Sequence, residues 1–192
     1  MKKILIIYYT NNGSTKKMAE KISRGVDSVE SVEAVVRTLP NIKNTFDNEI
    51  ANDENILFAT NDDLSNCDGL IMGSPTHFGN MAAHMKVFLH STTSEWFNNT
   101  LSGKPAGVFT STSSIHGGQE TTLLTMMIPL LHHGMIITGI PYSENDLNDT
   151  RTGGSPYGPT HFSGDKNKEL SKNEINLCIA FGSRIALLAK KL

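Results

Sequence analysis

The sequence has little cysteine, little net charge and no long apolar run, and each shortage excludes a class of protein. Its two cysteines, Cys67 and Cys178, are far apart and in neither a CxxC nor a zinc-ligand spacing, which favours free thiols in a reducing cytoplasm. A net charge of −2 argues against a general nucleic-acid or anionic-membrane binder. No apolar run approaches the roughly 20 residues of a membrane span, so none is expected.

Several catalytic and nucleotide-binding motifs are also missing. The chain has no Walker A pattern, no Gly-x-Gly-x-x-Gly fingerprint and no His-Glu-x-x-His pair. The strained Gly-x-Ser-x-Gly turn of a serine hydrolase is absent too, although serine is abundant. The sequence therefore excludes the commonest nucleotide-hydrolysing, metallopeptidase and esterase designs.

Seven histidines raise the possibility of a metal site. However, His77, His84 and His90 lack the i, i+4 spacing that places two ligands on one helix face. We therefore predict no metal site. We expect His84, His90 and His161 to be ordinary surface or interface residues.

A chain of 192 residues, 38% of them hydrophobic before glycine is counted, is long enough for one domain with a full core. We treat residues 1–192 as a single domain. Five short apolar runs alternate with helical patterns: Lys3–Tyr9, Glu33–Leu39, Gly69–Met72, Ala106–Phe109 and Met135–Ile140. Continuous apolar runs are typical of parallel strands that are covered on both faces. The alternation predicts a doubly wound α/β fold with three layers.

Helix signals lie between the apolar runs. A single stripe at helical spacing follows the first run: Met18, Ala19, Ile22 and Val26. Before the last helical pattern, Ser171 and Glu174 form a capping box. Two long polar segments, Asn41–Ser65 and Tyr142–Lys168, do not fit the alternation. Loops of this length usually cover a site or form an interface, although a solvated insertion is an equal reading for Asn41–Ser65.

The turn after the first strand, residues 10–15, is rich in hydroxyl side chains and contains a glycine. Because the first amides of a helix have no partner within the helix, such a turn binds anions without a lysine. Its sequence, with the strand before it and the helix after it (Ile6–Ile22), resembles the flavodoxin phosphate-binding signature. That resemblance implies a loop that holds the phosphate of FMN.

Later segments resemble one branch of this family more specifically. Gly73–Met81 is similar to the Gly-[ST]-Pro-Thr-Arg-[FY]-Gly-Asn-Met loop of WrbA-type NAD(P)H:quinone oxidoreductases, which lies against the flavin ring. Ser111–Glu120 resembles their Ser/Thr/Gly-rich run that ends Gly-Gly-Gln-Glu. Leu131–Met135 and Gly153–Gly158 match their His-His-Gly-Met and Gly-Gly-[ST]-Pro-Tyr-Gly elements. The resemblance therefore runs from the first strand to the last helix, and it implies a flavodoxin-like five-stranded parallel sheet in the order 2-1-3-4-5.

The resemblance also implies a set of site residues. The residues expected to bind FMN are Thr10, Asn12, Gly13, Ser14, Thr15, Pro75, Thr76, His77, Phe78, Gly79, Asn80, Ser111, Thr112, Ser113, Ser114, Gly117, Gly118 and His133. Those expected to border the substrate are Asn12, Trp96 and His133. No side chain is expected to act as a general base, because the flavin carries the chemistry.

The function implied by the resemblance is FMN-dependent reduction of quinones by NADH or NADPH, with two electrons transferred in a ping-pong cycle. The implied assembly is a homotetramer, a dimer of dimers. The alternatives are a flavodoxin-type electron carrier and an FMN-binding redox sensor with little NAD(P)H activity. Three positions depart from the family pattern: His77 replaces an arginine, Asn12 replaces an aromatic residue, and Ser14 replaces a histidine.

Overall fold

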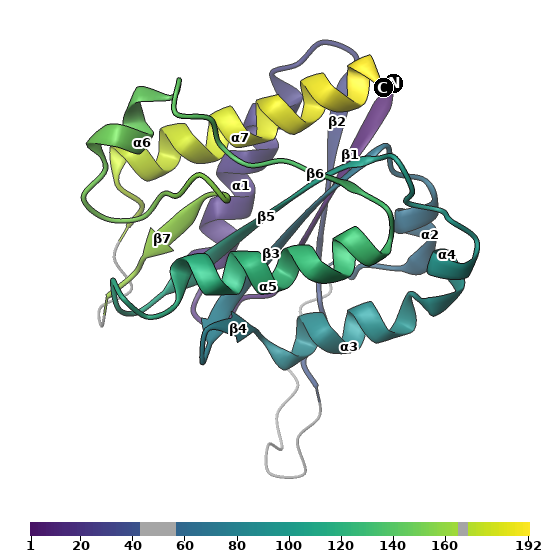
Figure 1. The fold of residues 1–192 in the computed structure, drawn as a ribbon, viewed down its shortest axis with the longest axis horizontal. Coiled ribbons are helices and arrows are strands. Elements are labelled where there is room, and N and C mark those ends of the chain that lie inside the picture. The colour runs from purple at the N-terminus through teal and green to yellow at the C-terminus, as the bar shows by residue number, and fades with distance from the viewer. Residues whose placement is uncertain (43–56, 165–168) are drawn as a thin grey trace.

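The five apolar runs form strands of one sheet in a computed structural model of the protein, which describes residues 1–42, 57–164 and 169–192 (Figure 1). The parallel strands lie in the order β2 (Val32–Thr38), β1 (Lys2–Tyr8), β3 (Gly69–His77), β5 (Pro105–Thr112) and β6 (Ile136–Ile137). This arrangement confirms the predicted order and the flavodoxin-like fold. The strand order reverses between β1 and β3, where ligands bind in open sheets of this kind.

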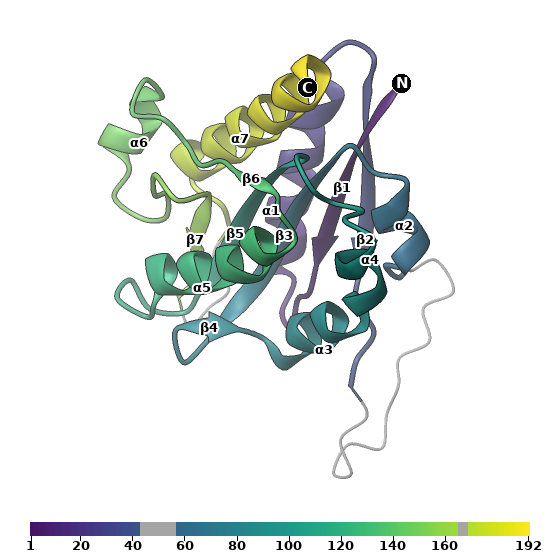
Figure 2. The same cartoon turned by 45° about the vertical axis from the view of Figure 1, so that its right-hand side comes forward.

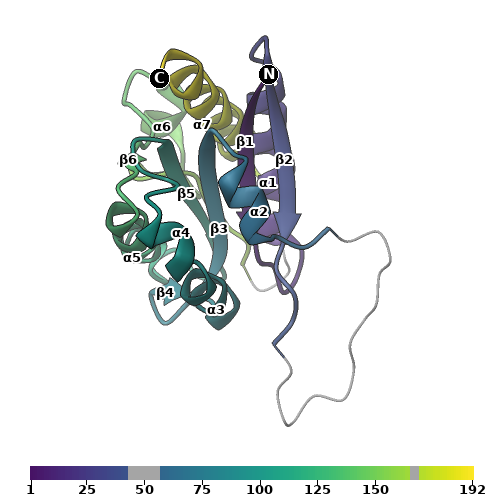
Figure 3. The ribbon, with the colours of Figure 1, turned by 90° about the vertical axis from the view of Figure 1, so that its right-hand side faces the viewer.

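Helices cover both faces of the sheet, as Figure 3 shows from the side. One face carries α1 (Ser14–Asp27) and α7 (Lys172–Lys191), with α6 (Asn145–Asp149) beside α7. The other carries α2 (Asn61–Ser65), α3 (Ala83–Ser91), α4 (Thr93–Phe97) and α5 (Gln119–His132). Strand β1 alternates between the two cores, with Ile4 and Ile6 in one and Leu5 and Ile7 in the other.

The predicted helix signals are confirmed. The stripe on α1 is fully buried in the core that α1 shares with α7. At the start of α7, the Ser171 hydroxyl accepts a hydrogen bond from the Glu174 amide at 3.3 Å. The Glu174 carboxylate in turn accepts one from the Ser171 amide at 2.7 Å. This capping box fixes where α7 begins, and hence where Glu174 lies.

Both cysteines are buried and free, as expected. They lie on opposite faces of the sheet, Cys178 in the core beneath α1 and α7 and Cys67 in the core beneath α3 and α5. Burial raises the pKa of the Cys67 thiol to about 11. No disulfide therefore contributes to the fold, and both thiols are protonated near neutral pH.

The fifth strand is shorter than predicted, because the sheet edge beside β5 is shared. Strand β6 pairs only with Pro105 and Ala106, at the beginning of β5. The Thr110 amide farther along β5 donates to the Pro159 carbonyl, and β7 (Thr160–Phe162) pairs with the end of β5 (Figure 2). The expected strand Met135–Ile140 therefore stops early, since a later segment of the chain occupies the rest of that edge.

The two long polar segments behave differently. Tyr142–Lys168 contains α6 and β7, and part of it returns to the end of the sheet where β5 stops. Most of Asn41–Ser65 lies outside the described residues. Its last part forms a short bridge between Phe58 and Thr38 and then α2. A short hairpin also forms after β3, where β4 (Asn80–Met81) turns back to pair antiparallel with it. No helix in the described ranges is long and apolar enough to span a membrane.

Candidate functional site

A cavity of about 300 Å³ lies where β1, β3 and β5 end. Parallel strands of this kind place their carboxyl ends at the same edge, which brings three separate loops together. The cavity is lined by Thr10, Asn11, Asn12, Ser14, Thr15, Pro75, Thr76, His77, Ser111, Thr112, Ser113, Ser163 and Gly164. Ten of these residues belong to the set expected to bind FMN.

The loop before α1 forms one wall of this cavity. Gly13 has a left-handed backbone (φ +85°), and its amide donates to the Thr10 hydroxyl at 3.0 Å. Helix α1 begins without a side-chain cap. The partial positive charge of the helix start is therefore available to an anion. Gly13 itself shapes the turn and does not line the cavity.

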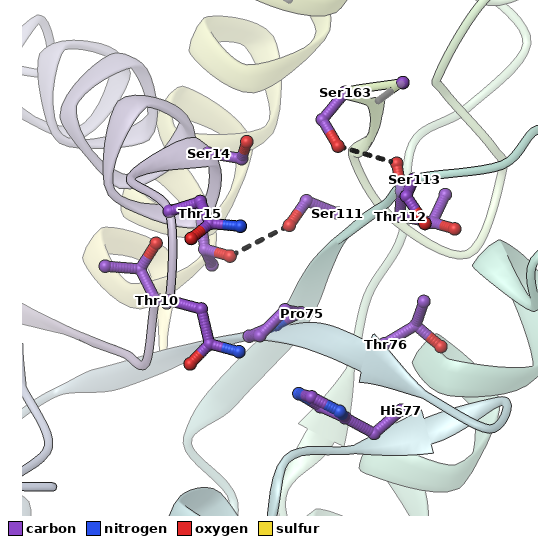
Figure 4. A pocket seen from close by; sticks show the side chains of 13 residues that line it. Thr10, Ser14, Thr15, Pro75, Thr76, His77, Ser111, Thr112, Ser113 and Ser163 are labelled. Carbon is purple, nitrogen blue, oxygen red and sulfur yellow. Dashed lines mark hydrogen bonds between the residues drawn. The ribbon is translucent and has the colours of Figure 1, made fainter. Parts of the chain in front are cut away.

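The opposite wall comes from β5. The Thr15 hydroxyl lies 3.0 Å from the Ser111 hydroxyl, and Figure 4 shows these groups facing each other across the cavity floor. Both side chains are buried. Pro75, Thr76 and His77 approach from β3 (Figure 4). The cavity is thus surrounded by hydroxyls and amides.

Among the described residues, the lining contains no lysine or arginine, and His77 is its one titratable side chain. A phosphate monoester would be held there by hydroxyls and by the start of α1, a set of donors that suits its charge and size. We call the Thr10–Thr15 turn together with Ser111 the phosphate cradle. The residues present therefore fit the phosphate end of FMN.

The loops after β3 and β5 touch each other beside the cavity. Gly79 (φ +74°) and Gly118 (φ +93°) both have left-handed backbones. A Cβ atom on Gly118 would lie 2.8 Å from the Gly79 Cα, so the two loops meet backbone to backbone. The Thr76 hydroxyl lies 2.6 Å from the Thr122 hydroxyl and ties β3 to α5. Such a contact leaves a flat backbone surface, which suits a planar ring.

Several other predicted site residues shape these loops without lining the cavity. Phe78 is fully exposed at the hairpin tip and has a strained left-handed backbone (φ +53°). The Asn80 side chain caps the hairpin by accepting from the Met81 amide at 2.8 Å. The Ser114 carbonyl accepts from the Gly117 amide at 3.1 Å and closes the turn after β5.

Three lining residues were not anticipated. Asn11 lies within the predicted phosphate loop, so its position was predictable although its contact was not. Ser163 and Gly164 follow β7, in the long Tyr142–Lys168 segment. The Ser163 amide and hydroxyl both donate to the Thr112 carbonyl, at 2.9 and 3.0 Å. Only the length of that segment hinted at a role in the site.

Trp96 and His133 lie elsewhere in the protomer, in a second cavity of about 330 Å³ between α3, α4 and α5. The Trp96 indole donates to the His132 carbonyl at 2.9 Å, and His133 Nε2 lies 3.0 Å from the Thr92 hydroxyl. That hydroxyl already donates to the Leu89 carbonyl. His133 therefore donates from Nε2. Burial lowers the pKa of His133, so its ring is neutral at pH 7.

The histidine predictions have mixed outcomes. His90 is exposed, as expected. His84 is partly buried and stacks on Tyr9 with ring centroids 3.6 Å apart. The expectation for His161 is wrong, because its ring is fully buried and contacts Glu174 at 3.1 Å. Among the described residues, no three histidine, cysteine, aspartate or glutamate side chains gather as metal ligands would.

The sheet topology and the cavity at its switch point define a flavodoxin-like flavoprotein. The chain belongs to the NADPH-dependent FMN reductase family, whose model matches residues 2–145. It is thus a member of a flavin oxidoreductase family, and FMN is its cofactor.

Solved structures share the fold over the whole chain. A WrbA-like flavodoxin from Agrobacterium tumefaciens is similar with a TM-score of 0.69 and 20% sequence identity, over 100% of this chain and 99% of that one. A flavodoxin from the domain Archaea has a TM-score of 0.63 and 21% identity, over 98% and 99%. Flavodoxin 1 from Bacillus cereus has a TM-score of 0.63 and 17% identity, over 96% and 97%.

Proposed function

We propose that this protein is a cytoplasmic FMN-dependent NAD(P)H:quinone oxidoreductase of the WrbA type. When bound, FMN supplies the redox chemistry, accepting hydride from NADH or NADPH and then reducing a quinone by two electrons in ping-pong order. The observation that carries the proposal is the pair of glycine-containing loops that meet beside a hydroxyl-rich phosphate cradle. These loops bear the segments that resemble WrbA-type enzymes.

The residues have distinct roles in this proposal. Thr10, Gly13, Ser14 and Thr15 hold the phosphate, with Asn12 beside them. The two loops that grip the ribityl chain and ring are Pro75–Asn80 and Ser111–Gly118. Their contact through Gly79 and Gly118 orients the ring and excludes water from one face of it. The other face stays open to nicotinamide and quinone in turn.

The second cavity supports a flat apolar substrate. Its walls include Trp96, Leu89, Ile128 and Pro129, around the neutral ring of His133. Aromatic and aliphatic side chains of this kind bind an uncharged quinone ring better than they bind a charged protein surface. We therefore assign Trp96 and His133 to the substrate side.

The two cavities have no lining residue in common within one protomer. An assembly in which one copy supplies Trp96 and His133 to the flavin of another would complete the substrate side. Exposed apolar side chains lie on α3, α4 and α5, the helices that contribute to the second cavity: Val87, Phe97, Leu124, Ile128 and Leu131. Apolar surface of this extent supports the homotetramer.

If the proposed homotetramer forms, one charge added to its apolar surface should change both the oligomeric mass and the quinone turnover. Light scattering is expected to give about four times the 21.0 kDa mass of the chain for the native protein. The substitution Ile128→Lys places a charge in the apolar surface and should dissociate the tetramer and reduce quinone turnover together. Leu187→Lys, at a similarly exposed position on α7, is the matched control and should do neither. A native protein of monomer mass would contradict the assembly.

A flavodoxin-type electron carrier is the second candidate, supported by the flavodoxins among the similar structures. A carrier of this class would bind FMN in the same cradle and pass electrons to a protein partner. Such carriers are usually strongly acidic for docking, whereas this chain has a net charge of only −2. The redox sensor resembles this second candidate, because it would also bind FMN with little NAD(P)H turnover.

Anaerobic mixing separates these candidates. The FMN-loaded protein is mixed with NADH and separately with NADPH while the flavin absorbance is followed, and benzoquinone is added afterwards. Rapid bleaching that the quinone reverses is the expected result, and it also identifies the preferred nucleotide. Flavin that stays oxidised with both nucleotides would overturn the enzyme proposal in favour of the carrier or sensor.

A further inference from the structure

The second cavity differs from the phosphate cradle in the charge of its lining. It lies on the face of the sheet that α3, α4 and α5 cover (Figure 3), and Lys86 of α3 is part of its lining. Among the described residues, no aspartate or glutamate lines it. Two other cavities that contain a cation also contain a carboxylate, since one is lined by Arg37 and Asp63 and the other by Arg184 and Glu144. The second cavity is therefore suited to a ligand with negative charge.

Polar and apolar parts of this lining come from the same two helices. On α3, Lys86 and His90 are one turn apart with Leu89 between them, and all three line the cavity. On α5, His132 follows Ile128 by four residues, and both line it too. A lysine ammonium and the N–H groups of imidazoles donate hydrogen bonds to phosphate oxygens. Ring contacts and donors for an anion therefore share one cavity of about 330 Å³.

Glu95 of α4 is an acidic residue close enough to act electrostatically on His133. Its carboxylate accepts a hydrogen bond from the Asn61 side chain at 3.2 Å, so it is held toward α2, and it does not line the cavity. Lys86 itself is exposed. The carboxylate of Glu95 therefore leaves the ammonium of Lys86 as the charge that a ligand in the cavity meets.

The two substrates of the proposed reaction differ in charge. NADH and NADPH both carry a pyrophosphate one ribose away from the nicotinamide ring, whereas a quinone such as benzoquinone is uncharged. A cavity that both rings enter in turn distinguishes them only through a group that recognises the anion. Lys86 supplies such a group in the lining.

We propose that Lys86 is a specificity-determining residue that binds the pyrophosphate of the nicotinamide nucleotide. His90 and His132 donate further hydrogen bonds to that group, and the nicotinamide ring lies against the apolar walls. A quinone uses the same walls without contacting Lys86. This role rests on the proposed function, in which nicotinamide and quinone follow each other at one face of the flavin.

The first test follows the two half-reactions separately in Lys86→Gln. In the FMN-loaded protein, the NADH concentration that gives half the maximal rate of flavin bleaching should rise about tenfold, because a hydrogen bond from a charged group contributes roughly that factor. The limiting bleaching rate and reoxidation by benzoquinone should match those of the native protein. Lys86→Arg keeps the charge and should restore most of the affinity. Lys172→Gln, which removes an exposed lysine from α7, is the matched control and should change neither half-reaction.

NADH and NADPH share the pyrophosphate, so Lys86→Gln should weaken both to the same extent. A loss with NADPH alone would assign Lys86 to the 2′-phosphate and overturn the pyrophosphate contact. Unchanged half-maximal concentrations with both nucleotides would overturn the proposal outright. Slower reoxidation by benzoquinone in Lys86→Gln would do the same, because Lys86 would then not distinguish the two substrates.

A binding measurement decides the proposal without any flavin reduction. Trp96 is the only tryptophan of the chain and lines the cavity, so its fluorescence reports when a ligand enters. Oxidised nicotinamide mononucleotide carries a phosphate and should bind the native FMN-loaded protein about tenfold more tightly than nicotinamide riboside, which carries none. High salt should reduce this preference, and Lys86→Gln should bind the two ligands alike.

A preference for the mononucleotide that persists in Lys86→Gln would contradict the proposal. Trp96 fluorescence that responds to neither ligand would also contradict it, because the nicotinamide ring would then not enter this cavity. Normal binding in a protein whose flavin neither nucleotide reduces would instead overturn the proposed function and leave the Lys86 contact standing. The two proposals therefore fail separately.

Discussion

The substitution Thr15→Val is expected to weaken FMN binding by about 100-fold while changing riboflavin affinity little. Valine has nearly the same shape as threonine, but it removes the hydroxyl that faces the cavity and contacts Ser111 at 3.0 Å. A hydrogen bond to a charged group contributes about 1.5–3 kcal/mol, and the Ser111 hydroxyl would also lose a partner. Since about 1.4 kcal/mol corresponds to a factor of ten, the loss amounts to roughly two powers of ten.

Fluorescence titration of the apoprotein with each flavin measures this effect. Thr138→Val is a matched control, because Thr138 is also buried but lies on the sheet edge away from the cavity, where it accepts from the Arg184 side chain at 3.3 Å. The control should lose some stability and keep its FMN affinity. An FMN affinity unchanged by Thr15→Val would show that the phosphate binds elsewhere.

The strands and the position of the phosphate cradle were predictable because their signals are local, whereas the strand order was an expectation from the family resemblance. The continuous apolar run in β1 and the stripe on α1 reflect burial on both sides of one short segment. The turn between them must contain the residues that suit a helix start and an anion. Each of these patterns lies within about twenty consecutive residues, so no long-range contact had to be known.

The role of the late segment was not predictable in the same way. Strand β7 has only three residues, and its pairing with β5 joins positions about fifty residues apart. Nothing in the local pattern around His161 distinguishes a buried strand from a polar loop. The expectation that His161 is an ordinary surface or interface residue was wrong for this reason. Glu174 was recognised as a cap, but a carboxylate has two oxygens, and its bonds to Gly153 and Phe162 depend on where the strand returns.

The substitution Gly118→Ala should reduce affinity for FMN and riboflavin alike, by at least about tenfold. It changes the contact between Gly79 and Gly118, which we call the ring wall because it borders the flavin ring in the proposed site. A Cβ atom there would lie 2.8 Å from the Gly79 Cα and 2.9 Å from the Thr121 hydroxyl oxygen. Relieving these contacts must move the hairpin after β3 away from the loop after β5. The backbone at φ +93° adds a strain of about 1–2 kcal/mol.

Gly103→Ala is a control that separates the effect of backbone strain from the effect of displacing the two loops. Gly103 also has a left-handed backbone (φ +76°), but a Cβ atom there would meet nothing within 4 Å. In a denaturant titration, Gly103→Ala should therefore lose about 1–2 kcal/mol of unfolding free energy, and Gly118→Ala at least as much, because it adds the close contacts to the same strain. Only Gly118→Ala should change the flavin absorbance spectrum and lower flavin affinity.

Comparison with Thr15→Val then distinguishes the two parts of the site. A substitution in the phosphate cradle lowers FMN affinity but not riboflavin affinity, whereas a substitution in the ring wall lowers both. Equal flavin affinities in the two glycine variants would mean that the contact between Gly79 and Gly118 does not border the ring.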